Sequence, residues 1–301
     1  MSENATNQTK SPGKFVMQHV WKTGGTELCR LARANGWKVP ETPGCTIFIH
    51  PHQGWPEEDY DMYGNEGAIP SGIVDNEFFP RNEFATRNHN WKTAHGVKWI
   101  TTLRHPYART LSHYNHVKLQ AKFQNLTFEE FLVERGGGFE HFIDNQQTRW
   151  HCGTGHCANT KFQVNEEKLS HAISNLDKMS AVLLLEGMKD PTSCTRRQMR
   201  HVLQFKNETL DGQAEPDLTP KTRHSSKTDW EQVVRPFLDN RGISTNSSVN
   251  GFNTSVIMSA LGFHNSYDMQ LYGYARHLCE VLADQYDQEA NTNAITNQLN
   301  R

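Results

Sequence analysis

Three short apolar runs, each followed by a helical stretch, constrain the fold of this chain more than any other feature. The runs cover residues 14–20, 97–103 (VKWITTL) and 181–186 (AVLLLE), and helical patterns follow at residues 27–35, 108–121 and 191–205. The third run is continuously apolar, as in a strand that helices cover on both faces. Strands that alternate with helices predict an α/β fold, with helices flanking a central parallel sheet in three layers.

The remaining segments predict one domain with polar ends. Residues 1–13 are expected to be a disordered tail and residues 288–301 a polar, frayed C-terminal tail, which leaves residues 14–287 as the domain. Further helices are predicted at residues 127–134, with a capping box, 166–179 and 268–287. Residues 37–80 are rich in Pro, Gly and Trp and predict long loops with short elements.

Charge and hydropathy exclude some classes of protein and partner. The net charge of −2 gives no argument for a nucleic-acid or membrane-surface partner. There is no run of 18 apolar residues, so no transmembrane segment is visible, and the first residues lack the apolar core of a signal peptide. Six cysteines permit disulfides without requiring them, and nothing in the sequence indicates an oligomeric state.

The stretch MQHVWKTGGTEL, residues 17–28, predicts an anion-binding loop between the first strand and its helix. A helix that opens after such a turn presents backbone N–H groups and the positive end of its dipole. Gly24 and Gly25 permit close approach of the backbone, Thr23 and Thr26 add hydroxyl donors, and Lys22 adds a positive charge. The lysine precedes the glycines, whereas the common phosphate loop places it after them.

A second basic motif, WITTLRHPYARTLSHYNH, follows the strand at residues 97–103. Arg104 ends that strand, and Arg109 and Ser112 lie in the first turns of the next helix. Ligands of open parallel sheets bind beyond the carboxyl ends of the strands, so both loops are expected at one crevice. No Asp or Glu occurs between Phe84 and Phe128, whereas seven Lys or Arg and five His do, which favours an anionic ligand.

Together the two motifs, K-T-G-G-T after one strand and L-R-x-P-x-x-R-x-x-S after a later one, resemble sulfotransferases that use 3′-phosphoadenosine 5′-phosphosulfate (PAPS). The stretches QHVWKTGGTEL, LRHPYARTLSHYNHV, FEEFL, DNQQTRW and DMQLYGYARHL are similar to the heparan sulfate 6-O-sulfotransferase branch, in that family's order. The chain departs from the pattern at His105, where the family usually has Asp. The resemblance implies a P-loop-like fold, a carbohydrate or other hydroxyl-bearing acceptor, and the Golgi lumen, whereas the visible N-terminus carries no address.

The resemblance also implies roles for these residues. The first loop would hold the 5′-phosphosulfate, with Lys22 at the bridging oxygen, and Arg104 and Ser112 would hold the 3′-phosphate. The base that takes the acceptor proton would be a histidine upstream of the second motif, either His89 or His95. No metal is required in this scheme.

Three further groups of residues are candidates for contact with cofactor or acceptor. Arg109 is assigned to the acceptor, and Asn145 and Arg149 either contact cofactor or acceptor or form a buried polar helix cap. The loop TPKTRHSSK would close over the nucleotide through Lys221, Thr222 and Arg223, or else be a solvated loop.

The stretch HCGTGHC, residues 151–157, has four side chains of zinc-ligand type, but its spacing favours a local Cys152–Cys157 disulfide or a plain loop. Three alternatives to a carbohydrate sulfotransferase stay open: transfer to a small alcohol or a peptide tyrosine, a P-loop kinase, and an inactive module that binds 3′,5′-bisphosphoadenosine (PAP). The reversed lysine order and the lack of an obvious metal-binding carboxylate at a strand end argue against the kinase.

Overall fold

The computed structural model describes residues 13–45, 60–65, 97–120, 123–133, 143–153, 163–206, 248–249 and 252–299. Its centre is a parallel four-stranded sheet in the order β2-β1-β3-β4. The strands are β1 (Lys14–Gln18), β2 (Met62–Asn65), β3 (Val97–Leu103) and β4 (Ala181–Leu184). The predicted α/β class and parallel sheet are therefore confirmed. A separate antiparallel pair joins β5 (Ser248–Val249) to β6 (Phe252–Asn253).

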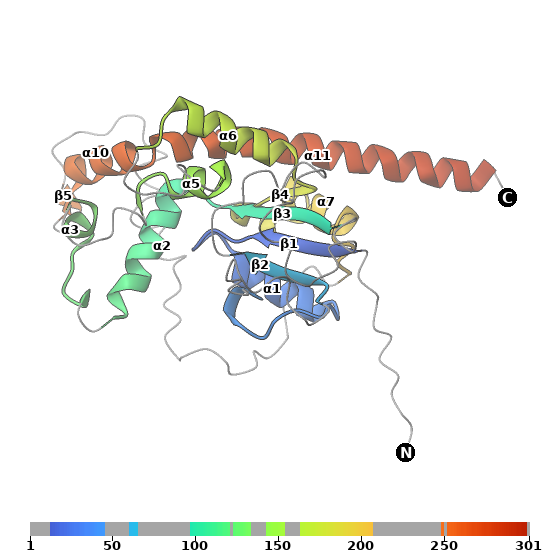
Figure 1. Cartoon of the computed structure of the whole chain (residues 1–301), viewed down its shortest axis with the longest axis horizontal. Helices are drawn as coiled ribbons and strands as arrows, with labels where there is room; N and C mark the ends of the chain where they lie inside the picture. Colours follow the sequence, from blue (N-terminus) through green and yellow to red (C-terminus); the bar gives the residue numbers. More distant parts are fainter. Residues whose placement is uncertain are drawn as a thin grey trace, which may run out of the picture.

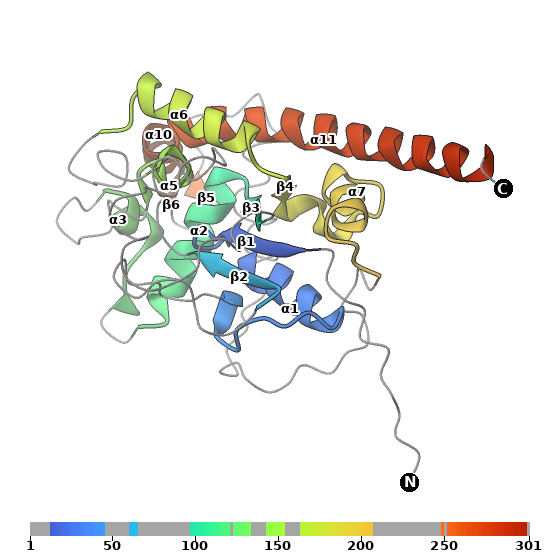
Figure 2. The same cartoon turned by 45° about the vertical axis from the view of Figure 1, so that its right-hand side comes forward.

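Helices cover both faces of the sheet. They are α1 (Gly25–Ala34), α2 (Pro106–Lys118), α3 (Phe128–Val133), α5 (Gln146–Cys152), α6 (Glu166–Asp177), α7 (Cys194–His201), α10 (Thr254–His264) and α11 (Ser266–Leu299), with the short 3₁₀ turns η1 (Pro43–Cys45) and η4 (Leu185–Lys189). In Figure 1, α1 lies on one face of the sheet and α6 and α11 lie on the other. Figure 2 shows α7 beside β4 and beneath α11.

Alternation along β4 explains why helices are needed on both faces. Ala181 and Leu183 join a cluster with α1, whereas Val182 and Leu184 join a second cluster with α6 and α11. All four side chains are buried. Because successive side chains of a strand point to opposite faces, a wholly apolar strand requires cover on both.

A third apolar cluster holds α2, α3 and α10 together at the end of the molecule where β3 leads into α2 (Figure 1). Leu111 from α2, Phe131 from α3 and Leu261 from α10 are all buried there. Both the first turn of α2 and the loop before it are thereby supported from two sides, by the sheet and by this cluster.

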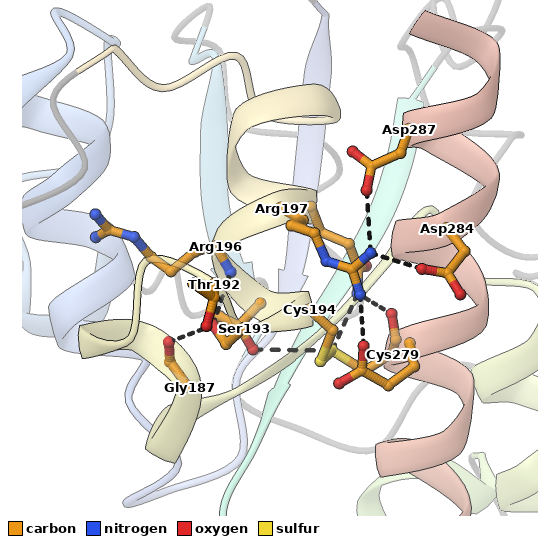
Figure 3. Close-up of polar contacts among 12 residues, drawn as sticks. Gly187, Thr192, Ser193, Cys194, Arg196, Arg197, Cys279, Asp284 and Asp287 are labelled. Atoms are coloured by element: carbon orange, nitrogen blue, oxygen red, sulfur yellow. Dashed lines mark hydrogen bonds and ion pairs between the residues drawn. A yellow bond between two sulfur atoms is a disulfide. The ribbon is translucent and has the colours of Figure 1, made fainter. Parts of the chain in front are cut away.

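Helix α7 is tied to α11 by a disulfide and by charge, as Figure 3 shows. Cys194 is bonded to Cys279, and the Arg197 guanidinium reaches Asp284 at 2.6 Å and Asp287 at 3.0 Å. A second disulfide, Cys29–Cys45, joins α1 to η1. The acidic partners are largely exposed, so each ion pair contributes little alone, and the disulfide is the stronger tie.

Several predicted boundaries were wrong. The last helix runs to Leu299 rather than 287, so the predicted polar tail is helical up to that residue, and residues 291–298 are all exposed. Polar composition suggested fraying, but a helix that packing has already nucleated extends at little cost. Sequence patterns missed β2, α5 and α10. Residues 1–12 of the predicted N-terminal tail lie outside the described residues.

Among the helices that the structure describes, none is both long and apolar enough to cross a membrane.

Candidate anion-binding site

The loop between β1 and α1 makes a tight turn that ends at the first helical residue. The Thr23 backbone N–H and hydroxyl both donate to the Val20 carbonyl oxygen, at 3.3 Å and 2.8 Å. Gly24 is the N-cap of α1 and has no side chain to cap it. The Gly24 carbonyl oxygen instead accepts hydrogen bonds from Glu27 and Leu28, which start the helix.

Three consecutive backbone donors stand at this helix start. Within the described part of the chain, the N–H groups of Gly24, Gly25 and Thr26 donate to no backbone or side-chain acceptor. The helix dipole adds partial positive charge at the same point. Thr26 is also exposed, so its hydroxyl is accessible from solvent. The turn therefore presents a group of donors that suits an anion.

Both glycines are required by packing as well as by the turn. Gly24 has φ 101°, in the left-handed region, and a Cβ there would come within 2.5 Å of Leu185 Cδ1. At Gly25 a Cβ would overlap the His19 ring. A larger residue at either position would therefore require the Leu185 or His19 side chain to shift, and at Gly24 it would also adopt a strained backbone. The glycines were predicted only for close approach of a ligand, and the structure adds this internal reason.

Lys22 adopts a strained backbone for a residue with a Cβ, with φ 69°. Such conformations cost about 1 kcal/mol or more, and the surrounding structure must impose them. Here the Lys22 carbonyl oxygen accepts a hydrogen bond from Arg104 Nη1 at 3.3 Å. The first loop is thus held by the guanidinium that ends the second motif.

Arg104 lies at the carboxyl end of β3, next to β1 in the sheet, where Gln18 pairs with Thr101. The Gln147 side chain fixes its backbone: Arg104 N–H donates to Oε1 at 3.0 Å, and Nε2 donates to the Arg104 carbonyl oxygen at 2.9 Å. Burial lowers the pKa of Arg104, while the nearby Glu186 raises it. Arg104 is half-buried. The predicted meeting of the Lys22 loop and Arg104 is therefore present in the structure.

A cluster around Glu186 supports the start of α2. Glu186 Oε1 accepts from the His105 backbone N–H, and Oε2 accepts from the Tyr272 hydroxyl, both at 2.9 Å. The His105 ring lies 5.5 Å from the Tyr272 ring. Burial, aided by the charges of Arg276 and Arg104, lowers the pKa of His105 to about 4, so this ring is neutral at pH 7.

Thr23 does not present its hydroxyl to a ligand, contrary to the prediction. Its side chain is fully buried, and the hydroxyl lies 3.1 Å from the Thr102 hydroxyl on β3 as well as bonding Val20. Adjacent parallel strands bring these two threonines together. Sequence spacing alone does not reveal which way the side chain turns. Thr23 therefore joins the loop to the sheet.

Arg109 was assigned to the acceptor, and this was wrong. Its side chain is 0% exposed, and the guanidinium donates to Gln146 and Thr110. Burial lowers the pKa of Arg109 to about 10, and the attraction of Asp268 opposes the shift. A side chain with no exposed surface has no contact with a bound acceptor. Arg109 instead supplies positive charge inside the protein.

Asn145 and Arg149 also proved to be structural, in the buried-cap arrangement that the sequence left open. Asn145 Oδ1 accepts from the backbone N–H groups of Tyr267 and Asp268, at 2.8 Å and 3.0 Å, and so caps the start of α11. Asp268 in turn accepts from the first turn of α5, through the Thr148 N–H and hydroxyl. Arg149 lies within α5 and pairs with Asp144.

The zinc hypothesis for residues 151–157 fails on its first two members. Cys152 is disulfide-bonded, and His151 is fully buried with Nε2 at 2.8 Å from the Thr101 hydroxyl and Nδ1 at 2.7 Å from the Gln147 carbonyl oxygen. The carbonyl needs a donor, so the neutral ring carries its proton on Nδ1 and accepts at Nε2. Burial lowers the pKa of His151 to about 4, which fits a neutral ring.

The remaining predicted site residues are Ser112, which the structure describes, and five residues that it does not. Ser112 is half-buried on α2, three residues after the buried Arg109. Five others lie outside the described residues: His89, His95, Lys221, Thr222 and Arg223. Their predicted roles remain predictions.

Sequence reasoning missed a histidine close to the loop. His116, exposed and one turn after Ser112 on α2, has its pKa lowered by burial and by the charge of Lys22. The Trp21 ring stacks on His113 with 6.2 Å between centroids, and His113 lies 6.4 Å from His116. The i, i+4 spacing from Ser112 was a usable signal, because such residues share a helix face.

No protein-family model matches the chain, and no curated protein shows significant sequence similarity to it.

Proposed function

We propose that this protein is a sulfotransferase of the P-loop-like fold, which moves a sulfuryl group from PAPS to an acceptor hydroxyl. One observation carries the proposal: Arg104 and the Lys22 loop, separate in sequence, meet at the ends of adjacent parallel strands through a 3.3 Å hydrogen bond. A donor with two separate anionic groups requires two such sites side by side. Arg104 also suits phosphate because its guanidinium presents several N–H donors in a fixed plane.

The N–H groups of Gly24, Gly25 and Thr26 would hold the 5′-phosphosulfate, and the Lys22 ammonium would stabilise negative charge on the leaving oxygen. Lys22 lies before the glycines, on the strand side of the turn. Its strained backbone costs free energy, which fits a residue whose position serves binding or catalysis. Transfer of this kind depends mainly on positioning and charge stabilisation.

Arg104 and Ser112 would hold the 3′-phosphate, with Lys221, Thr222 and Arg223 closing over the nucleotide. Arg104 fits this role because its backbone is fixed on both sides by Gln147, while its side chain stays half-buried beside the loop. A charged side chain that is partly desolvated and rigidly held binds an anion with less loss of entropy.

The proton of the acceptor hydroxyl needs a base, and three histidines are candidates. His89 is preferred and His95 follows, both by the family resemblance. His116 joins them because it lies on α2 one turn after Ser112, and partial burial and the charge of Lys22 lower its pKa, which favours the neutral ring that can accept a proton. Alanine variants at the three positions separate them: the base is the one whose loss abolishes turnover and leaves PAP binding intact.

The acceptor would be a carbohydrate hydroxyl of the heparan-sulfate 6-O type, on the strength of the branch resemblance. The direct test incubates the protein with PAPS labelled in the sulfuryl group and heparan, chondroitin, other polysaccharides, tyrosine peptides and small alcohols. Label on a polysaccharide supports the proposal in full. Label only on a peptide or alcohol changes the acceptor class, and tight PAP binding without any transfer favours an inactive module.

A P-loop kinase is the second candidate, and Glu186 is the observation in its favour. The sequence argument against a kinase was the lack of a carboxylate at a strand end, but Glu186 lies just after β4. Each of its oxygens already accepts a hydrogen bond, which favours an anchoring role over a metal ligand. Transfer of labelled phosphate from ATP, with no transfer from PAPS, would establish the kinase instead.

A further inference from the structure

We propose that Glu186 is a positioning residue that fixes the start of α2, and with it Arg104, for the anion that Arg104 binds. The inference rests on the proposed function, because it assigns Glu186 a part in holding the PAPS 3′-phosphate. Glu186 itself would not touch the nucleotide.

The start of α2 has no cap of its own. Its N-cap, His105, makes no side-chain capping hydrogen bond, and Pro106 at the first helical position has no N–H to offer. The Glu186 carboxylate, brought by η4 from the end of the neighbouring strand, accepts the His105 N–H at 2.9 Å. A negative charge at this point also complements the helix dipole.

Glu186 is itself held in place by α11. The Tyr272 hydroxyl donates to Oε2 at 2.9 Å, and the Tyr272 ring packs edge-on against His105. The carboxylate thus joins three elements: β4 through its own backbone, α2 through His105, and α11 through Tyr272. Arg104 is the residue immediately before His105, so loss of the Glu186 contact would leave the Arg104 backbone held by Gln147 alone and its guanidinium less firmly placed.

Electrostatic repulsion alone predicts the opposite, that loss of the Glu186 charge strengthens nucleotide binding. Glu186 is exposed, and a carboxylate close to a phosphate site repels the ligand. If repulsion dominates, removing the charge tightens nucleotide binding. If positioning dominates, removing it weakens binding, because the gain in mobility of Arg104 exceeds the relief of repulsion. The sign of the effect therefore separates the two.

The test measures PAP affinity by titration calorimetry for the whole chain and three variants. Glu186→Ala removes the charge and both hydrogen-bond acceptors, Tyr272→Phe removes only the hydroxyl that holds Glu186, and Glu289→Ala removes an exposed charge on the outer part of α11 as a control. We expect Glu186→Ala to weaken PAP binding about fivefold and Tyr272→Phe about threefold, with Glu289→Ala unchanged, the range for partly exposed hydrogen-bonded charges. Melting temperatures check that the variants stay folded.

The outcomes distinguish a failure of the positioning role from a failure of the proposed function. Unchanged or tighter PAP binding by Glu186→Ala, while Arg104→Ala binds weakly, overturns the positioning role and leaves the proposed function standing. A wild-type chain that does not bind PAP overturns the proposed function itself. Because a merely structural role would lower the melting temperature without changing affinity, a Glu186→Ala variant with that behaviour also counts against the proposal.

Discussion

The loop at Lys22 and the polar layer around α5, which comprises Arg109, Asn145 and His151, both contain polar groups. The two regions differ in whether the protein itself supplies the hydrogen-bond partners. In the loop, the N–H groups of Gly24, Gly25 and Thr26 have no acceptor among the residues that the structure describes, and Lys22 is strained. In the layer, Arg109, Asn145 and His151 are buried and bonded to named partners. A polar group bonded inside the protein helps to stabilise the fold, whereas a donor without a protein acceptor is available to a ligand.

The largest expected effect tests the loop. Lys22→Ala is expected to reduce turnover about a thousandfold, because the charge that stabilises the leaving oxygen is lost. The melting temperature should stay near that of the wild type, and it is measured alongside sulfate transfer from labelled PAPS. Lys38→Ala, at a lysine outside the loop, is the matched control. Activity that survives in Lys22→Ala removes the lysine from the chemistry.

In the polar layer around α5, a substitution is expected to reduce stability rather than turnover. Arg109→Leu should lower the free energy of unfolding by about 3 kcal/mol, because the buried Gln146 side-chain oxygen loses its guanidinium donor and the attraction between Arg109 and the buried Asp268 is lost. Urea unfolding measures this, and Arg30→Leu, at a half-buried arginine that pairs with Glu27 at 3.5 Å, should lose far less. If Arg109→Leu stays stable but loses acceptor affinity, the acceptor role that burial excludes would have to be restored.

His151 predicts how stability depends on pH. Its folded pKa of about 4 lies below the unfolded value of 6.5, so its contribution is complete above pH 6.5 and is lost as the pH falls toward 4. The loss is at most about 3 kcal/mol. Urea unfolding from pH 7.5 to 4 should show this slope, and His151→Gln should flatten part of it. His105, whose pKa is also lowered to about 4, should still contribute to the slope in this variant. An unchanged slope in His151→Gln would contradict the assignment.

The smallest effects are expected at the two threonines of the loop, which should differ in whether substitution changes stability or PAPS binding. Thr23→Val should lower stability by about 1 kcal/mol, since its buried hydroxyl bonds Val20 and Thr102. Thr26→Val should leave stability within about 0.5 kcal/mol, because this side chain is exposed. A rise in the KM for PAPS is expected only for Thr26→Val. Equal kinetic effects in both variants would show that the loop acts as one unit.

Local patterns predicted most of the frame. The strand at residues 97–103 was placed with its correct bounds, and both basic motifs fell at strand ends, because apolar runs and helix periods are written locally. The four-residue strand β2 was missed, since so short an edge strand has no period of its own. Helix α5 was missed for a similar reason: it is short, and its polar side chains are buried by partners far away in the chain.

The sequence by itself determined the parallel α/β frame and the pairing of a glycine loop with a basic motif at one edge of the sheet. Only the tertiary structure decided which polar side chains remain for a ligand. Thr23, Arg109, Asn145 and Arg149 were predicted as site residues, and each is buried: other elements supply partners for the first three, and Asp144 pairs with Arg149. The physical reason is that hydrogen-bond satisfaction depends on neighbours brought together by folding, such as Asp268, 120 residues from Thr148.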